Sequence, residues 1–253
     1  DLTKGGKKGN VPYGTLTTID ESPKKFGLLY AGTDDGRLHV SEDGGNNWEQ
    51  ITDGLPENYW VSRITASAHD KDRAYLALNG YRWDNFKALV YITENKGGKW
   101  QRIGEKLPNE PVNVIKEDPE NEDILYVGTD HGLYISLDRG QSFMAMDQGL
   151  PDVAVHDLVI HPEAHDLLVG THGRSLFRAN LEHLQQMDRK LLAKDVHFFE
   201  PEKLKHTENW GKKAWSRWLG VTEPEIELAY FTKEGGKMQF SVSYQNQQLF
   251  QMD

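Results

Sequence analysis

The chain has 253 residues and a mass of 28.9 kDa, enough to bury one large hydrophobic core or two smaller ones. Its net charge of −10 and its isoelectric point near 5.5 argue against a nucleic-acid partner. The absence of cysteine excludes disulfides and thiolate metal sites, and no apolar run approaches the ~20 residues that a membrane-spanning helix needs.

Short apolar strands alternate along the chain with turns that are rich in glycine, aspartate and asparagine. After a loop at residues 1–9, which we predict joins two repeat units, strands are expected at 14–19 and 28–31. A Gly-Thr turn at 32–33 follows, and the next strand leads into a polar turn. The strand after that ends in a Leu-Pro turn at 55–56. Four short strands within about fifty residues are typical of one blade of a β-propeller.

The polar turn occurs three times as one motif, Ser/Thr-x-Asp/Asn-x-Gly-x-x-aromatic. Its copies begin at residues 41, 93 and 136, so that they lie 52 and 43 residues apart. The Asp or Asn side chain can accept hydrogen bonds from backbone N–H groups of the turn, and the glycine supplies a positive φ. We predict a structural role for all three copies: Ser41, Asp43, Gly45, Trp48, Thr93, Asn95, Gly97, Trp100, Ser136, Asp138, Gly140 and Phe143.

The order of strands and turns returns in four units, at residues 11–60, 61–111, 112–154 and 155–180. The last unit has three predicted strands and no copy of the turn motif. The sequence therefore predicts an all-β fold, a β-propeller of four-stranded blades that is part of a larger propeller, within residues 1–187. We expect further blades to be supplied by the same polypeptide or by a partner.

Beyond residue 187 the sequence changes character. Residues 188–222 are predicted to be a connector, whose basic and aromatic run contains Trp210, Trp215 and Trp218 and is expected to pack between domains. Residues 223–253 are predicted to be the first strands of a second β domain, an immunoglobulin-like sandwich. A hairpin is expected there, formed by strands at 226–231 and 238–244 around two glycines.

The turn motif resembles the Asp-box of bacterial neuraminidase-type (BNR) repeats. The stretch from Tyr13 to Asn180 is similar to a family of bacterial envelope proteins with sortilin-like propellers, in particular at residues 32–48, at 60–64 and at 170–175. This resemblance implies a propeller followed by a sandwich domain, and an extracytoplasmic location in the bacterial periplasm, at the outer-membrane surface or in the medium. It does not imply a reaction, because one fold serves many functions.

Propeller geometry indicates where a ligand would bind. The turn motifs would lie on one face of the propeller, and the turns between second and third strands would lie on the opposite face, together with the loops between blades. An aromatic and charged insert at residues 79–86 is the best candidate to reach a ligand. The predicted ligand-binding residues are Asp34, Asp35, Arg63, Tyr81, Arg82, Trp83, Asp84, Asp130, His131, Asp157, His172 and Arg174, with Asn113 beside them.

The alternative for these residues is structural: Asp34 and Asp130 would cap their turns, and the insert aromatics would pack on a neighbouring blade. A sialidase would need its arginines together, and no motif places Arg63, Arg82 and Arg174 side by side. A metal site built from His156, His161 and His165 is not expected, because Pro162 interrupts them. An assembly factor of the photosystem type would need an arginine-rich patch, which this acidic chain lacks.

The sequence thus favours a non-catalytic binding or scaffold propeller for a protein or glycan partner, without cofactor or metal. The alternative function is glycoside hydrolysis, which needs only two carboxylates at a suitable separation. The aspartates of the predicted ligand-binding set offer many such pairs.

Overall fold

The computed structural model describes residues 14–201, 203–204, 206–212, 221, 223–237, 239–245 and 247–252. The predicted loop at 1–9 and two connector tryptophans, Trp215 and Trp218, lie outside the described residues. The chain divides into two compact units, Asp1–Gln186 and Met187–Asp253.

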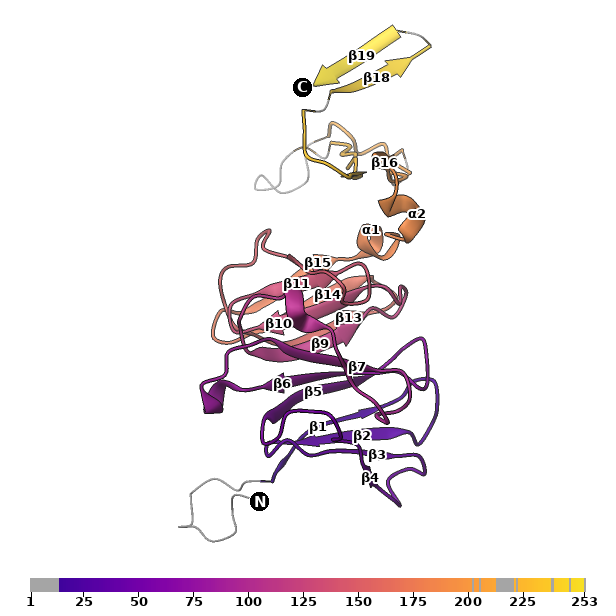
Figure 1. The fold of residues 1–253 in the computed structure, drawn as a ribbon. Helices are drawn as coiled ribbons and strands as arrows, with labels where there is room; N and C mark the ends of the chain where they lie inside the picture. Colours follow the sequence, from indigo (N-terminus) through magenta and orange to yellow (C-terminus); the bar gives the residue numbers. More distant parts are fainter. Residues whose placement is uncertain are drawn as a thin grey trace. The chain divides into compact units, whose positions relative to one another are not determined.

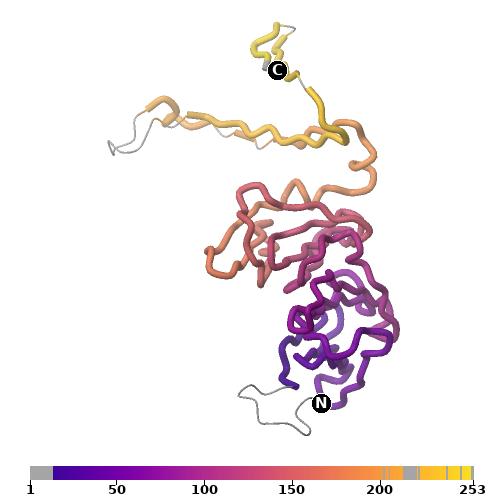
Figure 2. Tube along the Cα trace, turned by 60° about the vertical axis from the view of Figure 1, so that its left-hand side comes forward, coloured from indigo at the N-terminus to yellow at the C-terminus, as the bar shows by residue number. Residues whose placement is uncertain are grey.

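Within the first unit, four antiparallel sheets follow one another in chain order, three with four strands and the last with three. Successive strands are hydrogen-bonded neighbours, so each sheet is a meander. Figure 1 shows these sheets stacked in sequence, from indigo to orange, and the Cα trace in Figure 2 follows the same order. The strands are β1 (Leu16–Glu21), β2 (Leu29–Thr33), β3 (Leu38–Ser41), β4 (Glu49–Gln50), β5 (Trp60–Ala66), β6 (Ala74–Asn79), β7 (Leu89–Thr93), β8 (Gln101–Arg102), β9 (Val112–Glu117), β10 (Leu125–Thr129), β11 (Leu133–Ser136), β12 (Met144–Ala145), β13 (Val155–His161), β14 (Asp166–Thr171) and β15 (Leu176–Asn180).

Residues on both faces of the middle sheets are buried, because each of these sheets has a neighbour on either side. β6 is buried along its whole length. Since side chains alternate along a strand, Leu76 and Leu78 pack toward the first sheet, with Tyr30 and Trp100, while Tyr75 and Ala77 belong to the cluster shared with the third sheet. A third cluster joins the third and fourth sheets and includes Leu181, just before the short helix α1 (Glu182–Gln185).

The first strands, β1, β5, β9 and β13, pack beside one another in this order. Each has a free edge, because it pairs with only one strand of its own sheet. Hydroxyl groups of the preceding sheet donate hydrogen bonds to carbonyls on these edges: Thr17 to Val61 at 2.8 Å, Ser62 to Val112 at 2.7 Å and Thr65 to Ile115 at 2.9 Å. Hydroxyl side chains therefore link successive sheets around their common centre.

Among the described residues of the first unit, no further sheet covers the outer faces of the first and last sheets. Ile19, Ile64 and Ile115 occupy equivalent positions, because each pairs with the third residue of its second strand. Ile64 is 1% and Ile115 0% exposed, whereas Ile19 is 56% exposed. Apolar side chains also remain exposed on the last sheet, namely Val159, Leu168 and Leu176. The described sheets thus form an arc with two open ends, a partial β-propeller as the sequence predicts.

Each turn motif joins the third and fourth strands of its sheet and is closed by its own side chains. In the first copy, Ser41 Oγ accepts a hydrogen bond from the Gly45 N–H at 2.8 Å, and Asp43 Oδ1 accepts one from the Asn47 N–H at 2.8 Å. The second and third copies repeat both bonds, from Thr93 and Asn95 and from Ser136 and Asp138.

The second and third motifs also pack on the sheet before them. At Gly97, where φ is +92°, an added Cβ would lie 2.4 Å from the Ile51 side chain, and at Gly140 it would lie 2.8 Å from Ile103. The Trp100 indole donates a hydrogen bond to the Ile51 carbonyl at 2.8 Å and is buried. Trp48 has no preceding sheet within the described residues and is 41% exposed. The glycines therefore permit close approach between blades as well as the turn itself.

Replacement of Asp138 by alanine should lower the free energy of unfolding by about 1–2 kcal/mol. Although burial acts to raise it, hydrogen bonds from Ser142 and Ser136 hold the pKa of the Asp138 carboxyl below its usual value. A carboxyl with a lowered folded-state pKa stabilises the fold above its unfolded-state pKa, and this contribution is lost as pH falls through the folded-state value.

Urea unfolding at pH 7 and at pH 3 measures this effect, with the conservative variant Asp138→Asn as the control. The stability difference between wild type and Asp138→Ala should be smaller at pH 3. A difference that grows as the pH is lowered would contradict a stabilising ionised carboxylate in this turn.

The second unit contains α2 (Arg189–Leu192), β16 (Val196–Phe198), β17 (Tyr230–Thr232), β18 (Phe240–Tyr244) and β19 (Gln247–Met252). β16 pairs with β17, and β18 pairs with β19, in two separate two-stranded sheets. The predicted hairpin of 226–231 with 238–244 is therefore wrong. β16, which lies within the predicted connector, takes the place beside β17, and Phe198 packs against both Tyr230 and Phe240.

Candidate binding surface

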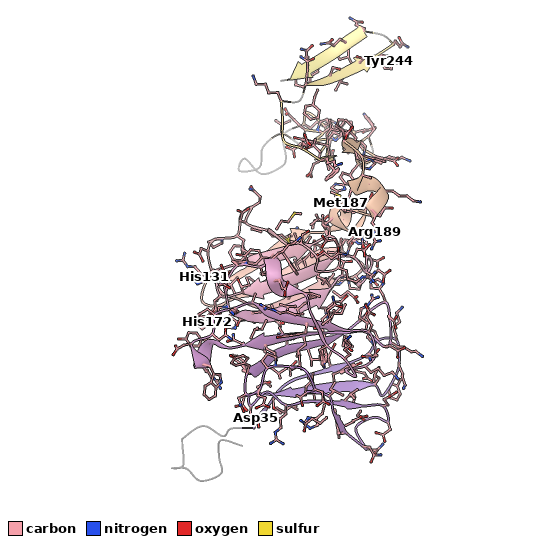
Figure 3. The ribbon with its side chains drawn as sticks, viewed as in Figure 1. Asp35, His131, His172, Met187, Arg189 and Tyr244 are labelled. Carbon is pink, nitrogen blue, oxygen red and sulfur yellow. The ribbon has the colours of Figure 1, made fainter. Side chains whose placement is uncertain are left out.

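Two faces of the first unit are distinguished by their turns. The motif face carries the turn motifs and the turns between first and second strands; the connection face carries the turns between second and third strands and the loops from one sheet to the next. The predicted ligand-binding residues occupy turns, loops and strand starts of the connection face. Figure 3 labels three of them, Asp35, His131 and His172, on the same side of the stacked sheets.

Asp34 is used by the chain itself. Its Oδ1 accepts hydrogen bonds from the Gly14 and Thr15 N–H groups, both at 2.7 Å, and the residue is buried. It thereby fixes the strand that enters the first sheet. Asp35 accepts a hydrogen bond from the Thr33 hydroxyl and lies 3.4 Å from the Arg37 Nε.

Asp130 is the last acceptor in a chain of side-chain hydrogen bonds that links the second and third sheets. The Asn113 amide donates to Asp130 Oδ1 at 2.9 Å, and the Asn79 amide donates to Asn113 Oδ1 at 3.1 Å. His131, next to Asp130, is exposed and its Nδ1 lies 3.2 Å from the Asp152 carboxylate.

Arg63 reaches from β5 to β13, two sheets further along. Its guanidinium donates to Asp157 Oδ1 at 2.8 Å and to the His156 carbonyl at 3.3 Å. The His156 and His172 rings lie 5.5 Å apart, and His172 and Arg174 are exposed. The structure thus brings Arg63, Asp157 and His172 into one neighbourhood.

The insert is a compact loop with an exposed aromatic surface. It contains the 3-10 turn η1 (Tyr81–Trp83), followed by Asp84 in the left-handed region at φ 53°. Tyr81 is 60%, Trp83 48% and Phe86 46% exposed, and the Tyr81 and Phe86 rings meet edge to face with centroids 6.1 Å apart. Exposed aromatic side chains gathered on one short loop are a feature of binding surfaces.

Polar contacts hold this loop against the connection between the first two sheets. The Trp83 indole donates to the Asn58 carbonyl at 2.8 Å, and the Asn85 amide donates to the Tyr59 hydroxyl at 2.8 Å. The Arg82 guanidinium lies 5.3 Å from the centroid of the Trp60 ring, within range of a cation–π interaction. Of the predicted binding residues, Tyr81 and Trp83 are therefore presented by a fixed loop.

A groove of about 420 Å³ lies next to the insert. Asn58, whose carbonyl accepts the hydrogen bond from Trp83 of the insert, is one of its lining residues. The groove runs between the turn at Asp35 and the Leu-Pro turn at 55–56. Gly36, at φ +83°, lines one side of the groove. It packs closely on the backbone of Tyr59, since an added Cβ would lie 2.8 Å from the Tyr59 carbonyl oxygen. The groove and the insert together are called the first-blade shelf. Two of the carboxylates that line the groove, Asp53 and Glu57, were not among the predicted residues.

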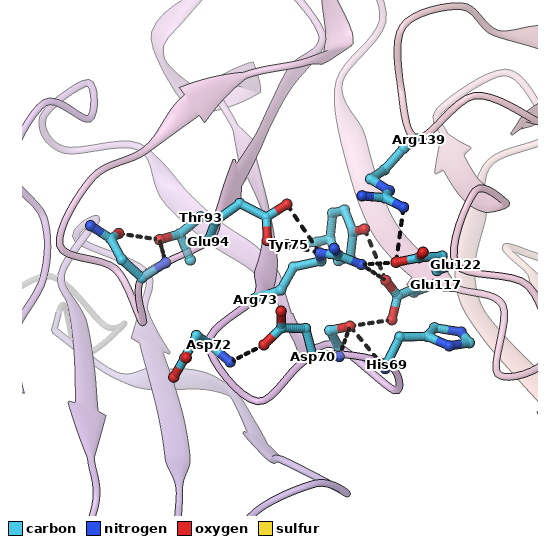
Figure 4. Close-up of polar contacts among 12 residues, drawn as sticks. His69, Asp70, Asp72, Arg73, Tyr75, Thr93, Glu94, Glu117, Glu122 and Arg139 are labelled. Atoms are coloured by element: carbon cyan, nitrogen blue, oxygen red, sulfur yellow. Dashed lines mark hydrogen bonds and ion pairs between the residues drawn. The ribbon is translucent and has the colours of Figure 1, made fainter.

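A second group of residues missed by the sequence analysis lies between the second and third sheets (Figure 4). Glu117, whose side chain is 1% exposed, accepts hydrogen bonds from the Ser67 hydroxyl and the Ala68 N–H at 2.7 Å and from the Tyr75 hydroxyl at 2.9 Å. The buried Arg73 lies 3.4 Å from the same carboxylate and also bonds Glu94 and Glu122. The sequence analysis could not predict the pair of Arg73 and Glu117, because the two residues lie 44 positions apart and no local charge pattern connects them.

Asp20 is a further titratable residue that the sequence analysis did not select. Burial raises the pKa of its carboxyl, against the hydrogen bond that it accepts from the Ala66 N–H at 2.8 Å. It lines a hollow of about 310 Å³ with residues of all four sheets, on the side of the first strands opposite to the connection face. This hollow is thus separate from the first-blade shelf.

Within the described ranges, no group of three or more His, Asp or Glu side chains is arranged to hold a metal ion. No helix among the described residues is long and apolar enough to cross a membrane.

No family model matches the chain. It is 28% identical over 156 residues to a xyloglucanase of Hypocrea jecorina, a match that covers 55% of this chain and 18% of that protein. It is 29% identical over 137 residues to the vacuolar protein sorting/targeting protein 10 of Aspergillus terreus, covering 49% and 8%. The chain therefore spans less than a fifth of the length of either relative.

The structure is similar to that of the GH74 xyloglucanase from Xanthomonas campestris, with a TM-score of 0.53 and 15% identity over 65% of this chain and 29% of the enzyme. At this identity the likeness concerns the fold alone. The fold defines the class: the described sheets are part of a β-propeller. In sequence, the chain is similar to a xyloglucanase and to a vacuolar protein sorting/targeting protein. The sortilin-like part of the predicted resemblance agrees with the second relative.

Proposed function

We propose that the chain is a non-catalytic binding module whose connection face holds a protein or glycan partner. The observation that carries this proposal is the insert, where Tyr81, Trp83 and Phe86 stay exposed on a loop that hydrogen bonds hold in place. A fixed loop loses little conformational entropy on binding, and aromatic rings offer a large contact area.

The aspartates of this face support binding more than hydrolysis. A glycosidase needs two carboxyl groups that face each other across the substrate, roughly 5–5.5 Å or 6.5–9.5 Å apart, one of them protonated near neutral pH. Asp34 accepts two backbone hydrogen bonds, Asp130 accepts one from Asn113, and Asp157 is paired with Arg63. These contacts engage the three carboxylates in holding loops and strands in place.

Glycoside hydrolysis is the second candidate, because the chain resembles a xyloglucanase over 55% of its length. Under this alternative, Asp35 and Asp130 are the carboxylates to test, since both lie in turns of the connection face.

Incubation with a panel of neutral and sialylated oligosaccharides distinguishes these two functions. We expect no release of reducing ends, whether or not calorimetry detects saturable binding. Turnover that is lost in Asp35→Asn or Asp130→Asn, with the melting temperature retained, would replace the binding proposal by the hydrolytic one. The matched control is Glu49→Gln, an exposed carboxylate on the outer strand β4.

We also propose an extracytoplasmic location, further blades that cover the open sheet faces, and no nucleic-acid partner. The resemblance to envelope propellers supports the first, the exposed Ile19 the second and the net charge of −10 the third. Fractionation of the native cells tests the location: recovery of the protein with cytosolic markers would contradict it.

A further inference from the structure

We infer that the first-blade shelf binds a polypeptide segment that presents an arginine or lysine next to an apolar side chain. This inference rests on the proposed binding function and names the partner of the same face. Two features carry it: carboxylates of the groove that lack a cationic partner, and the aromatic edge that adjoins them.

The groove is acidic beyond what its own cation neutralises. Arg37 lies 3.4 Å from Asp35, whereas Asp53 and Glu57 are exposed and form no ion pair with any residue in the described ranges. Asp84, on the insert, is also exposed, but the charge of Arg82 on the same loop offsets it, so the excess of negative charge lies with Asp53 and Glu57. A neutral sugar would leave these charges uncompensated, while a guanidinium or ammonium group would pair with them.

The aromatic edge is suited to the rest of such a segment. Trp83 is joined to the groove through Asn58, whose carbonyl accepts the indole hydrogen bond at 2.8 Å. An apolar side chain next to the basic residue can cover Tyr81 and Trp83, and an arginine can in addition stack on either ring. The Arg82 guanidinium already lies 5.3 Å from the Trp60 ring centroid in this region.

The third sheet offers an internal comparison. It has an equivalent groove of about 290 Å³, formed by the turn at His131 and the Leu-Pro turn at 150–151. There Asp152, which follows the Leu-Pro turn as Glu57 does in the first sheet, lies 3.2 Å from His131. The turn of the next sheet, at 172–175, takes the position of the insert, and His172 is its only aromatic residue. Asp147, which also lines the third groove, is exposed and forms no ion pair within the described residues, so the aromatic edge is what distinguishes the first groove.

The test uses the full chain and a fluorescein-labelled octapeptide of alternating arginine and leucine, followed by fluorescence anisotropy. We expect saturable binding that weakens roughly fivefold in Glu57→Gln and roughly tenfold in Tyr81→Ala. Asp152→Asn removes the same charge from the third groove and should leave the affinity unchanged. An octapeptide with glutamate in place of arginine should not bind.

Four outcomes would overturn the inference. Equal losses in Glu57→Gln and Asp152→Asn would show a response to net charge alone. Binding that is unaffected by both Glu57→Gln and Tyr81→Ala would place the peptide elsewhere. If an oligosaccharide from the panel binds, with loss in Tyr81→Ala, while the peptide does not, the partner is a glycan and the proposed binding function stands. If neither ligand binds this face, both proposals fail.

Discussion

Replacement of Glu117 by alanine should destabilise the protein by about 3–5 kcal/mol, because it leaves a buried arginine without its buried counter-charge. The carboxylate accepts hydrogen bonds from Ser67, Ala68 and Tyr75, and Arg73, with a side chain only 6% exposed, lies 3.4 Å away. Each of these groups would lose an acceptor in a place that water does not reach.

Equilibrium unfolding in urea measures this effect, and Glu122→Ala is the matched control. Glu122 bonds the same Arg73 at 2.9 Å, but its side chain is 47% exposed. Its removal should cost less than about 1 kcal/mol, since solvent screens exposed pairs. Similar losses for the two variants would show that the contact between the second and third sheets is open to water.

Replacement of Ile115 by alanine should cost about 2–5 kcal/mol, and the equivalent replacement of Ile19 less than about 0.5 kcal/mol. Both residues occupy the same register position of a first strand, but Ile115 is 0% and Ile19 56% exposed. The two variants delete the same atoms, so their difference measures how completely each face is covered.

The same urea titration tests this pair of variants. If Ile19→Ala is as costly as Ile115→Ala, the outer face of the first sheet is covered in solution, for example by another copy of the chain. The concentration dependence of the unfolding midpoint would then reveal such self-association.

The repeated turn motif could be predicted from the sequence because its interactions are local. Ser136, Asp138 and Ser142 bond one another within seven residues, so the eight-residue pattern contains both donors and acceptors. The strand meander follows from the same kind of information, since alternating apolar residues and tight turns pair each strand with the next. The predicted fold class is confirmed for this reason.

Contacts between distant segments decided the rest. Asp34 satisfies the N–H groups of Gly14 and Thr15, twenty and nineteen residues away, and Arg73 meets Glu117 across 44 residues. In the second unit, β17 was expected to pair with the strand that follows it, but it pairs with β16, which lies more than thirty residues earlier.

The candidate site shows the same division. The sequence alone identified the insert at 79–86 as aromatic, charged and placed on one face of a propeller. Only the tertiary structure joined it to Asn58 and to the groove that contains Glu57, because a ring's exposure and a carboxylate's lack of a partner depend on which loops fold beside them. The turn motifs depend on residues that are adjacent in the sequence, whereas the binding surface is formed by segments that come together only when the sheets stack.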